Sequence, residues 1–368
     1  MGRKTQPDLC VVSYSNLNYD ARSANLIAFY RNNGLDVVTY SISTNKSSDD
    51  KNLFFVVQKK QRFFINWIKF ALFGVRNFLK LSAKKYFAAD LYSLVFLRLL
   101  FKSPKCIIYD SREIFSELGT LHNQSLKQKI LSLIEKIAVK GISKIVVSGE
   151  LDAEYLKNYF KDTNKHYFVV KNLPIETRIV KTNYLREKYN IPEDKTVLIY
   201  QGVVLKGRGI LPLIDALKKS DKFAFVIIGE GNFIDEIKKI INHPDLNGKV
   251  FLHPQVKYSE LLNITASADI GVSLIEPITF SYQLALPNKL FEYIYAGLPV
   301  LVSDLPAMRH FVLDSGFGEV VQADFNPNEI LEKLNLISNN ICYYKNNIER
   351  KKNELTYTSQ ENVLKSIL

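Results

Sequence analysis

The sequence predicts an α/β fold with two Rossmann-like domains that face a central cleft. Its 368 residues suit two domains, since a domain usually takes about 100–200 residues. Short apolar segments alternate with amphipathic helical patterns, and the alternation starts afresh near Asn172–Pro174. Such alternation is typical of right-handed βαβ units with a parallel sheet covered on both faces. Ligands of these sheets bind beyond the carboxyl ends of the strands, so the loops that follow strands are where functional residues are expected.

The first domain is expected over residues 1–172. The helices expected in it are Ala21–Asn33, closed by Gly34, and Ser125–Lys140, and Ile42–Asn52 is expected to be a polar loop. The expected strands are Leu9–Tyr14, Asp36–Ser41, Cys106–Tyr109, Lys144–Ser148 and His166–Lys171.

The second domain is expected over residues 173–345. Its expected strands are Thr196–Gln201, Phe223–Ile228, Lys249–His253, Ile270–Ile275 and Pro299–Ser303. Its expected helices are Ile210–Lys219, Phe233–Ile241, Ser259–Ala266 and Asn288–Tyr295. Residues 346–368 read as a Lys-rich helix that packs back on the first domain.

The positive charge is concentrated in one part of the chain. The net charge is +12, and the stretch Lys51–Tyr109, with twelve lysines and arginines against the single acid Asp90, supplies +11 of it. A nucleic-acid-binding protein would more often spread basic residues over a domain face, so no nucleic-acid partner is expected. The polar start Met1–Asp8 predicts no signal peptide, and no uncharged apolar run reaches the roughly 18 residues of a spanning helix.

The cysteines and histidines suggest neither disulfides nor a metal site. The three cysteines lie far apart without a C-x-x-C pair, and the five histidines show no metal-ligand spacing. A reduced, cytoplasmic compartment fits this usage best. No metal ligand set is predicted.

The segment Gly202–Gly209 joins a predicted strand to a predicted helix and combines glycine with positive charge. Its three glycines, Gly202, Gly207 and Gly209, let the backbone approach a ligand closely, and a helix N-terminus attracts anions. Lys206 and Arg208 add formal charge, and arginine can grip a phosphate through two parallel hydrogen bonds. Taken alone, the loop is equally well explained as a tight surface turn with two solvated cations.

A second candidate segment is Pro287–Pro299. Lys289, Glu292 and Tyr293 share one face of its predicted helix, near the helix start. A carboxylate there is readily kept ionised and can accept both hydroxyls of a vicinal diol such as ribose. Helix capping with surface pairing of Lys289 and Glu292 is the simpler explanation when this segment is taken alone.

Together these segments resemble the donor half of the retaining GT-B glycosyltransferases of the large family with an E-x7-E helix (glycosyl transferases group 1, family four). Pro287–Pro299 matches the pattern P-x-K-x-x-E-Y-x-x-x-G-x-P, Arg208–Ala216 is similar to K-G-x-x-x-L-I-x-A, and Ile227–Gly231 is similar to I-x-G-x-G. In the first half, Asp20–Arg22 followed by Gly34–Val37, then Ile108–Glu113 and Val169–Asn172, resemble D-x-R…G-x-x-V, Y-D-x-H-E and V-x-P-N. The resemblance covers roughly residues 8–340.

This resemblance implies an enzyme of class EC 2.4, a hexosyl- or related glycosyltransferase. It would move a sugar from a nucleotide diphosphate sugar to a glycan or lipid-linked acceptor, with retention, in bacterial envelope polysaccharide or glycoconjugate synthesis. The first domain would lie on the acceptor side and the second would bind the nucleotide sugar. No metal or other cofactor is implied, because cationic side chains would stabilise the leaving diphosphate.

The resemblance also assigns roles to individual residues. The catalytic set is Arg208, Lys206, Lys289 and Glu113. The donor-binding set is Gly202, Gly207, Gly209, Gly229, Glu230, Pro254, Val256, Asn288 and Glu292, with Glu292 on the ribose. The acceptor or sugar side comprises Asp20, Arg22, Asp110 and Arg112.

Three positions depart from the family pattern. Leu284 stands where the first Glu of E-x7-E would fall, and Glu276 could serve instead only if the intervening loop folds back. Val203 replaces an Arg of the phosphate loop, for which Lys206 or Lys289 could compensate. Arg112 replaces the His of D-x-H-E. This departure bears more on the identity of the donor sugar than on the type of reaction.

The basic segment 51–105 is rich in aromatic residues. Cations near one stripe and Phe and Trp on the rest of Lys59–Lys85 are typical of a helix lying in a membrane interface. The expected membrane contacts are Arg62, Trp67, Lys69, Arg76 and Lys80. We therefore expect a peripheral protein on an anionic inner membrane face. A core helix with snorkelling cations is the alternative.

Two other functions remain open. A nucleotide-sugar epimerase on the same fold would need converging carboxylates and histidines, which Arg112 and the sparse histidines disfavour. A non-catalytic, membrane-associated scaffold with a degenerate donor site would explain the missing Glu at Leu284.

Overall fold

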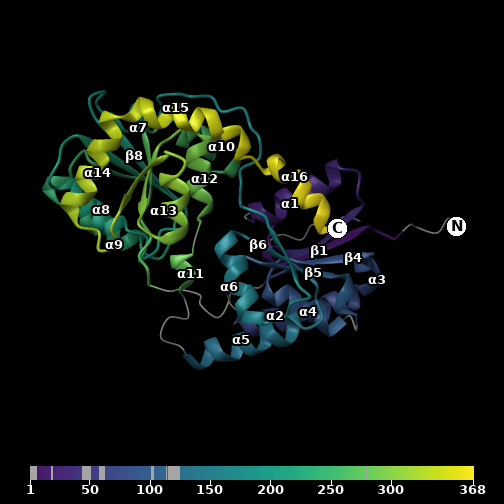
Figure 1. The fold of residues 1–368 in the computed structure, drawn as a ribbon. Coiled ribbons are helices and arrows are strands. Elements are labelled where there is room, and N and C mark those ends of the chain that lie inside the picture. The colour runs from purple at the N-terminus through teal and green to yellow at the C-terminus, as the bar shows by residue number, and fades with distance from the viewer. Residues whose placement is uncertain are drawn as a thin grey trace. The chain divides into compact units, whose positions relative to one another are not determined.

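The computed structural model describes residues 6–17, 20–43, 51–57, 63–100, 103–112, 114, 125–278, 280–284 and 286–368. The chain divides into two compact units. Unit 1 is Met1–Lys171 with Gln360–Leu368, and unit 2 is Asn172–Ser359. Each unit has one parallel sheet with helices packed against it, which confirms the predicted pair of Rossmann-like domains (Figure 1).

The sheet of unit 1 has seven strands in the order β3-β2-β1-β4-β5-β6-β7. All neighbouring strands pair in parallel. The strands are β1 (Leu9–Asn16), β2 (Val37–Ser43), β3 (Asn52–Val56), β4 (Lys85–Ala88), β5 (Ile107–Ser111), β6 (Lys144–Val147) and β7 (His166–Val169). The order reverses between β1 and β4, the place where open α/β sheets bind ligands.

The helices of unit 1 are α1 (Ala21–Asn32), α2 (Phe63–Arg76), α3 (Phe78–Leu81), α4 (Leu91–Leu100), α5 (Ser125–Val139), α6 (Glu150–Phe160) and α16 (Glu361–Ile367). α2, α4, α5 and α6 share one core, to which they contribute Phe70, Leu94, Val139 and Leu156. α16 is attached to α1 through the Tyr30 hydroxyl, which donates to the carbonyl oxygen of Leu364 at 2.7 Å.

The sheet of unit 2 has six strands in the order β10-β9-β8-β11-β12-β13. They are β8 (Thr196–Gln201), β9 (Phe223–Ile228), β10 (Val250–His253), β11 (Ile270–Ser273), β12 (Val300–Ser303) and β13 (Gly318–Val321). Its helices are α7 (Tyr184–Tyr189), α8 (Ile210–Leu217), α9 (Ile234–Ile240), α10 (Tyr258–Thr265), α11 (Phe280–Gln283), α12 (Asn288–Tyr295), α13 (Pro306–Leu313), α14 (Pro327–Asn339) and α15 (Ile341–Lys351). β8 and β9 are almost wholly buried, as expected for central strands of a parallel sheet.

The structure adds elements to those read from the sequence. The expected loop Ile42–Asn52 begins as the end of β2 and ends as the start of β3, and 44–50 lies outside the described residues. The basic segment 51–105 contains β3, β4 and three helices. Residues 346–368 hold the end of α15, two 3-10 turns and α16 rather than one helix, and only Gln360–Leu368 belongs to unit 1.

Within the described part of the chain, no helix has both the length and the apolar character needed to cross a membrane.

Candidate active site

The loop from β8 to α8 is shaped by glycines with positive φ. Gly202, Gly207 and Gly209 have φ of +124°, +83° and +63°, values that other residues rarely adopt. A Cβ on Gly209 would lie 2.2 Å from the Cβ of Leu274, just after β11. The loop therefore packs directly on the segment that follows β11, and α8 begins at this contact.

A second glycine turn supports the same loop. A Cβ on Gly229, after β9, would lie 2.0 Å from the carbonyl oxygen of Gly202. The backbone N–H of Val204 donates to the carbonyl oxygen of Glu230 at 2.9 Å. The two predicted donor-binding turns thus lie side by side, with Glu230 exposed at the outer edge.

Lys289 lies close to this loop. Its ammonium is 3.7 Å from the centre of the Tyr200 ring and would lie 3.5 Å from a Cβ on Gly202. Burial lowers the pKa of Lys289 well below its usual value, and the charge of Arg208 lowers it further, while Glu292 partly offsets both. No hydrogen-bond acceptor or ion-pair partner of this ammonium occurs among the described residues. A partly buried cation in this state is suited to an anionic ligand.

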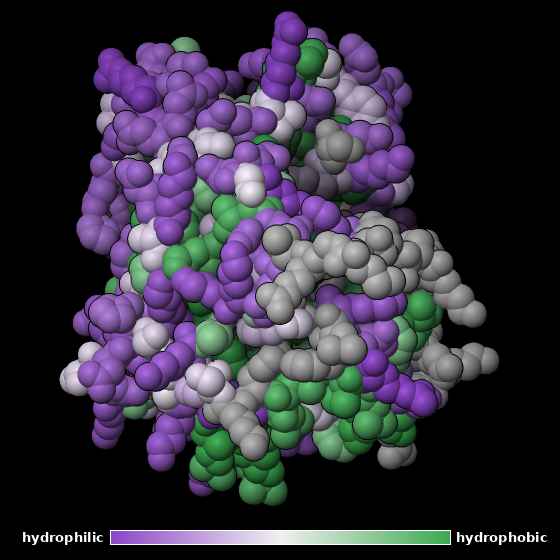
Figure 2. Space-filling model, turned by 90° about the vertical axis from the view of Figure 1, so that its right-hand side faces the viewer, coloured by the Kyte–Doolittle hydropathy of each residue, from purple (hydrophilic) through white to green (hydrophobic). Residues whose placement is uncertain are grey.

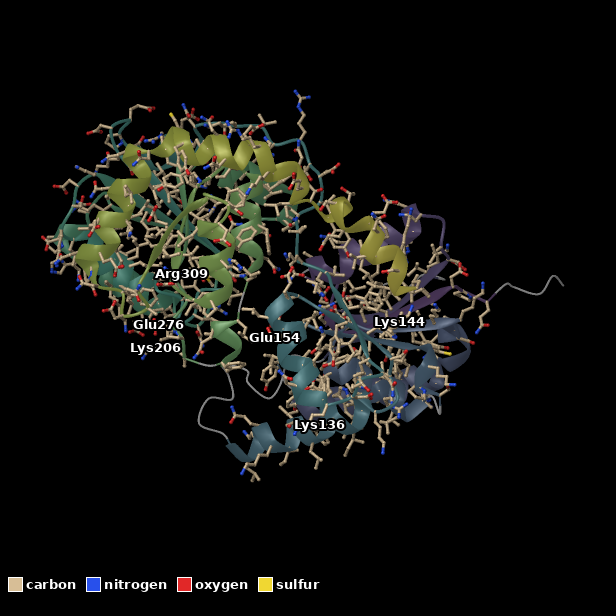
Figure 3. The ribbon with its side chains drawn as sticks, in the orientation of Figure 1. Lys136, Lys144, Glu154, Lys206, Glu276 and Arg309 are labelled. Carbon is tan, nitrogen blue, oxygen red and sulfur yellow. The ribbon has the colours of Figure 1, made fainter. Side chains whose placement is uncertain are left out.

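Arg208 is held by an aromatic ring. Its guanidinium carbon lies 4.7 Å from the centre of the Tyr282 ring, on α11. Lys206, by contrast, is exposed. Arg208 and Lys289 therefore interact near the loop. Lys206, which Figure 3 labels, lies at the outer edge of the loop.

Glu292 is buried on α12 and held by neighbours that the motifs do not name. The side-chain amide of Gln201 donates to Oε2 of Glu292 at 2.5 Å, and the hydroxyl of Thr265 donates to Oε1 of Gln201 at 2.6 Å. Burial raises the pKa of Glu292, while the bonds from Gln201 and Tyr258 and the charge of Lys289 lower it. Gln201 could have been noticed as a polar side chain at the end of an apolar strand.

The Tyr293 side chain does not face the glycine loop as those of Glu292 and Lys289 do. It is fully buried, and its hydroxyl accepts from the backbone N–H of Gln201 at 3.0 Å and donates to the carbonyl oxygen of Val272 at 3.3 Å. The expected common face is thus divided. Lys289 and Glu292 lie near the loop, and Tyr293 anchors α12 to β8 and β11.

Glu276 lies beside the phosphate-loop candidate. Its backbone N–H donates to the carbonyl oxygen of Gly207 at 3.1 Å, and Figure 3 labels Glu276 and Lys206 together. Leu284, at the motif position of the first Glu, is a half-buried apolar residue. The segment after β11 therefore places Glu276 beside the glycine loop, although Glu276 does not have the spacing of the E-x7-E motif.

The base of the nucleotide is expected beside the residues that follow β10. Pro254 is exposed and Val256 half-buried, while Asn288 is exposed at the start of α12. His253 Nδ1 lies 2.8 Å from the carbonyl oxygen of Pro254, and its Nε2 lies 3.2 Å from the Tyr184 hydroxyl. A carbonyl only accepts, so Nδ1 carries the proton. Both ring nitrogens of His253, at the end of β10, thus have partners. Burial lowers the pKa of His253.

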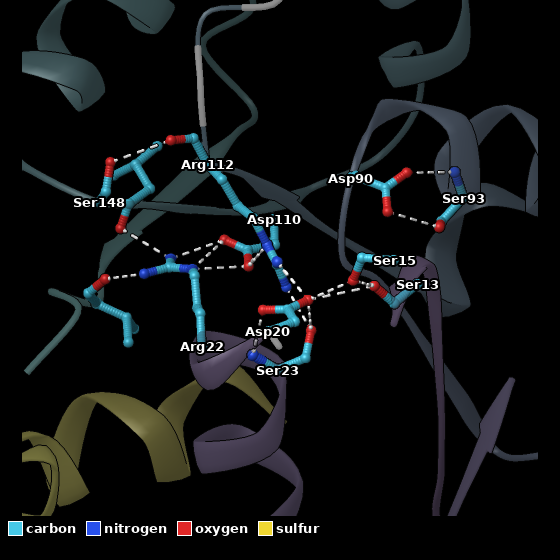
Figure 4. Close-up of polar contacts among 12 residues, drawn as sticks. Ser13, Ser15, Asp20, Arg22, Ser23, Asp90, Ser93, Asp110, Arg112 and Ser148 are labelled. Atoms are coloured by element: carbon cyan, nitrogen blue, oxygen red, sulfur yellow. Dashed lines mark hydrogen bonds and ion pairs between the residues drawn. The ribbon is translucent and has the colours of Figure 1, made fainter. Parts of the chain in front are cut away.

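Unit 1 gathers the four expected acceptor-side residues into one network (Figure 4). Arg22 binds Asp110 through two parallel bonds of 2.8 and 2.7 Å. Arg112 bridges Asp20 at 2.7 Å and Asp110 at 3.0 Å. The network lies at the carboxyl end of β5 and the start of α1, where the sheet order predicts ligand binding.

Charge within this network is closely balanced. Burial would raise the pKa of Asp20, but the charge of Arg112 and a hydrogen bond from Ser15 lower it to about 2. The Arg112 side chain keeps 18% of its surface exposed, whereas Arg22 keeps 6%. Arg112 is therefore the cation of the network that a ligand can reach, whereas the buried Arg22 holds Asp110 in place. Glu113 lies outside the described residues.

The expected membrane segment is divided between core and surface. Lys69 and Arg76 are exposed on α2, and Lys80 is exposed on α3. Trp67 is half-buried, and its indole N–H donates to the carbonyl oxygen of Tyr92 at 3.2 Å. Its expected role as a membrane contact stays a prediction. Arg62 lies outside the described residues.

Residues 181–354, nearly all of unit 2, match the family model described as glycosyl transferases group 1. The second unit is a domain of this family. The match agrees with the donor-side motifs of the sequence and supports a glycosyltransferase. No curated protein sequence matches the chain.

Solved structures show the same fold over both units. WaaG, a glycosyltransferase involved in lipopolysaccharide biosynthesis, has a TM-score of 0.71 at 15% identity, covering 98% of this chain and 99% of that one. Sucrose-phosphate synthase from Thermosynechococcus elongatus has a TM-score of 0.76 at 14% identity, covering 98% and 97%. HepE from Anabaena with UDP-glucose has a TM-score of 0.71 at 11% identity, covering 98% of each chain. The chain thus has the GT-B fold.

Proposed function

We propose that this glycosyltransferase transfers a sugar, with retention, from a nucleotide diphosphate sugar to a glycan or lipid-linked acceptor in bacterial envelope polysaccharide or glycoconjugate synthesis. The observation that carries the proposal is the pair Lys289 and Arg208 at the glycine loop. Burial and the nearby charge of Arg208 disfavour the charged form of Lys289, and its ammonium has no acceptor among the described residues, so a diphosphate suits this pair.

The donor would bind in three parts. Its diphosphate would lie over the glycine loop against Arg208 and Lys289, and its ribose would bond Glu292. Its base would lie beside Pro254 and Val256. Because HepE binds UDP and UDP-glucose, uridine nucleotides are the first donors to try.

Catalysis would be electrostatic. Negative charge develops on the diphosphate as the glycosidic bond breaks, and preorganised cations stabilise that charge more than they stabilise the ground state. Arg208 and Lys289 would supply this effect without a metal or other cofactor. In the described residues, no three His, Cys, Asp or Glu side chains gather as a metal ligand set.

The remaining assigned residues would act around this centre. Glu276 would take the part of the missing motif Glu, because its backbone bonds the glycine loop. Arg112, held by Asp20 and Asp110, would meet the sugar or acceptor bound to unit 1. Glu113 remains a proposed catalytic residue on motif grounds alone.

The deciding experiment is direct binding of nucleotides. UDP, GDP, ADP and CMP and their sugars are compared by thermal shift on the wild type, on Lys289→Ala and on Asp194→Asn as a surface control. A ligand at 100-fold its Kd should stabilise the folded protein by about 2.7 kcal/mol. Selective loss of that shift in Lys289→Ala supports the donor site. Equal shifts in all three proteins would contradict it.

Product analysis separates the rival functions. A glycosyltransferase releases the nucleoside diphosphate in step with acceptor glycosylation. An epimerase would convert one nucleotide sugar into another without an acceptor, and a scaffold would do neither.

The same proposal places the enzyme on the cytoplasmic face of an anionic membrane, docked through α2. Phe64 and Leu72 are 66% and 60% exposed on its outer face, and Lys69 and Arg76 are exposed beside them. Charge reversal at Lys69, Arg76 and Lys80 should abolish co-sedimentation with anionic vesicles and leave nucleotide binding intact. Unchanged sedimentation of that variant would refute docking by α2.

A further inference from the structure

Helix α5 presents an apolar stripe to the outside of unit 1. Its large aliphatic side chains remain exposed at Leu126 (70%), Ile130 (49%), Leu133 (60%), Ile134 (38%) and Ile137 (62%). Their positions follow helical spacing, so they lie along one face of the helix. Scattered surface leucines need no explanation, but a continuous stripe over three turns does.

The orientation of α5 is fixed by its opposite face. Glu135 is fully buried there, and its Oε1 accepts from the Tyr109 hydroxyl at 2.7 Å. Ala138 and Val139 on the same side belong to the core of unit 1. The aliphatic stripe therefore cannot turn inward without removing Glu135 from its buried hydrogen bond.

Charges on α5 border the stripe and are all positive at the surface. Helix geometry puts Lys127 at one margin and Lys129 and Lys136 at the other. The single acid of the helix is the buried Glu135, so α5 itself has no exposed carboxylate beside these lysines. Figure 3 labels Lys136, whose ammonium lies 4.4 Å from the centre of the Tyr159 ring.

α5 belongs to the same layer as α2. Both helices pack on one core of unit 1, with α4 in contact with each of them. The end of α4 adds Leu99, which is 71% exposed. Figure 2 shows hydrophobic side chains gathered at the lower end of the face turned to the viewer.

We infer that α5 is a second docking helix, whose aliphatic stripe inserts among the headgroups and upper acyl chains of an anionic bilayer. Aliphatic residues on the outer face with lysines at both margins are the pattern of an interfacial helix, because the lysines reach anionic headgroups while the stripe leaves water. The surface cations of α2 and α5 share one sign, which favours an anionic surface over a second copy of the same chain. The variants below test α5 separately from α2 and from the donor site.

The test uses the full chain and vesicles of phosphatidylglycerol with phosphatidylcholine. Leu133→Glu/Ile137→Glu should weaken partitioning into these vesicles at least tenfold. Leu336→Glu is the matched control, because Leu336 is 39% exposed on α14 of unit 2, and it should partition like the wild type. Circular dichroism and nucleotide-induced thermal shift report whether each variant is folded.

Charge and insertion are then separated. Lys127→Gln/Lys129→Gln should weaken vesicle binding less than Leu133→Glu/Ile137→Glu does. The binding that remains in this Gln variant should depend less on salt than that of the wild type. Trp67 is the single tryptophan and lies on α2, so its emission reports on that helix by itself.

Each outcome decides the inference. Wild-type partitioning of the folded Leu133→Glu/Ile137→Glu variant would overturn it and leave docking by α2 standing. Vesicle-independent dimers of the wild type that this variant dissociates would identify a second copy as the occupant and also overturn it. Loss of binding in this variant with α2 intact supports it, even if no nucleotide sugar is ever turned over.

Discussion

The guanidinium carbon of Arg208 lies 4.7 Å from the centre of the Tyr282 ring. Arg208 follows β8 in the glycine loop, whereas Tyr282 follows β11 on α11. A ring face holds a guanidinium by cation–π attraction and stacking, which limits its side-chain freedom before a ligand arrives. Residues 274–286, which lack the standard motif Glu, thus orient a cation of the loop.

We predict that Tyr282→Ala lowers kcat several-fold, because a cation–π contact contributes about 0.5–2 kcal/mol. Tyr282→Phe keeps the ring and should keep most of the activity. The measurement is kcat and KM for the nucleotide sugar in both variants. A loss in Tyr282→Phe as large as that in Tyr282→Ala would assign the effect to the hydroxyl instead of the ring.

Removal of the Arg208 charge should have a larger effect. Arg208→Ala is expected to lower turnover by roughly 10²–10³, the loss typical of deleting a group that stabilises developing negative charge. Lys206→Ala should cost far less, because Lys206 is exposed at the outer edge of the loop. Steady-state rates at saturating donor compare the two, and a larger loss for Lys206→Ala would reverse their roles.

The enzyme should keep its full activity in EDTA. A loss of activity that a divalent ion restores would refute metal-free catalysis.

The sequence predicted the architecture well because strand–helix alternation and the P-x-K-x-x-E-Y pattern are local signals. α12 runs over Asn288–Tyr295, as expected from its periodicity. β4 was missed because Lys85–Ala88 is a four-residue strand within a strongly basic segment, and the basic pattern there indicated an amphipathic helix instead.

Side-chain partnerships were less predictable. Glu292 is bonded by Gln201, 91 positions before it, and Gln201 is in turn bonded by Thr265, 64 positions after Gln201, so no local pattern links the three residues. The apolar stripe of α5 looked like an ordinary amphipathic helix, because periodicity shows that a helix has two faces but not which one is covered. The contact between Glu135 and Tyr109 identifies the face of α5 that is buried, and the sequence alone does not show this contact.

Donor binding should depend on pH through Lys289. Burial and Arg208 lower the pKa of Lys289, so its charge is lost at a lower pH than that of an ordinary lysine. A diphosphate stabilises the charged form, and binding should therefore take up protons and weaken as pH rises through the lowered pKa. Calorimetry in buffers of different ionisation enthalpy measures the uptake. Lys289→Arg keeps its charge and should flatten the pH profile; an unchanged profile would exclude Lys289 from the diphosphate.

Glu292→Gln should weaken nucleotide binding by about tenfold to a hundredfold without unfolding the protein, since a hydrogen bond to a charged group contributes about 1.5–3 kcal/mol. The loss should be confined to ligands with ribose hydroxyls. 2′,3′-Dideoxy-UDP is the matched probe, and its weaker affinity should be the same for wild type and variant. Gln201→Leu should give a smaller loss of the same kind, because Gln201 positions Glu292 without reaching the ligand. Equal losses for UDP and its dideoxy analogue would remove the ribose assignment.

The last prediction concerns the buried network of unit 1. Asp20 has a pKa of about 2 in the folded protein, below its usual 3.8, because Arg112 and Ser15 outweigh the effect of burial. A carboxyl with a lowered pKa stabilises the fold above its usual pKa and loses that contribution as pH falls through the folded value. The shift corresponds to about 2.5 kcal/mol, at about 1.4 kcal/mol per pKa unit.

Asp20→Asn should therefore lower the free energy of unfolding by about 2.5 kcal/mol at neutral pH, and its difference from the wild type should shrink from about pH 4 and vanish below about pH 2. Urea unfolding followed by circular dichroism across this range measures the difference. Asp194→Asn, at an exposed position of unit 2, is the control and should follow the wild type throughout. A deficit in Asp20→Asn that stays constant down to pH 2 would show that the carboxylate acts through the shape of its hydrogen bonds and not through its charge on Arg112.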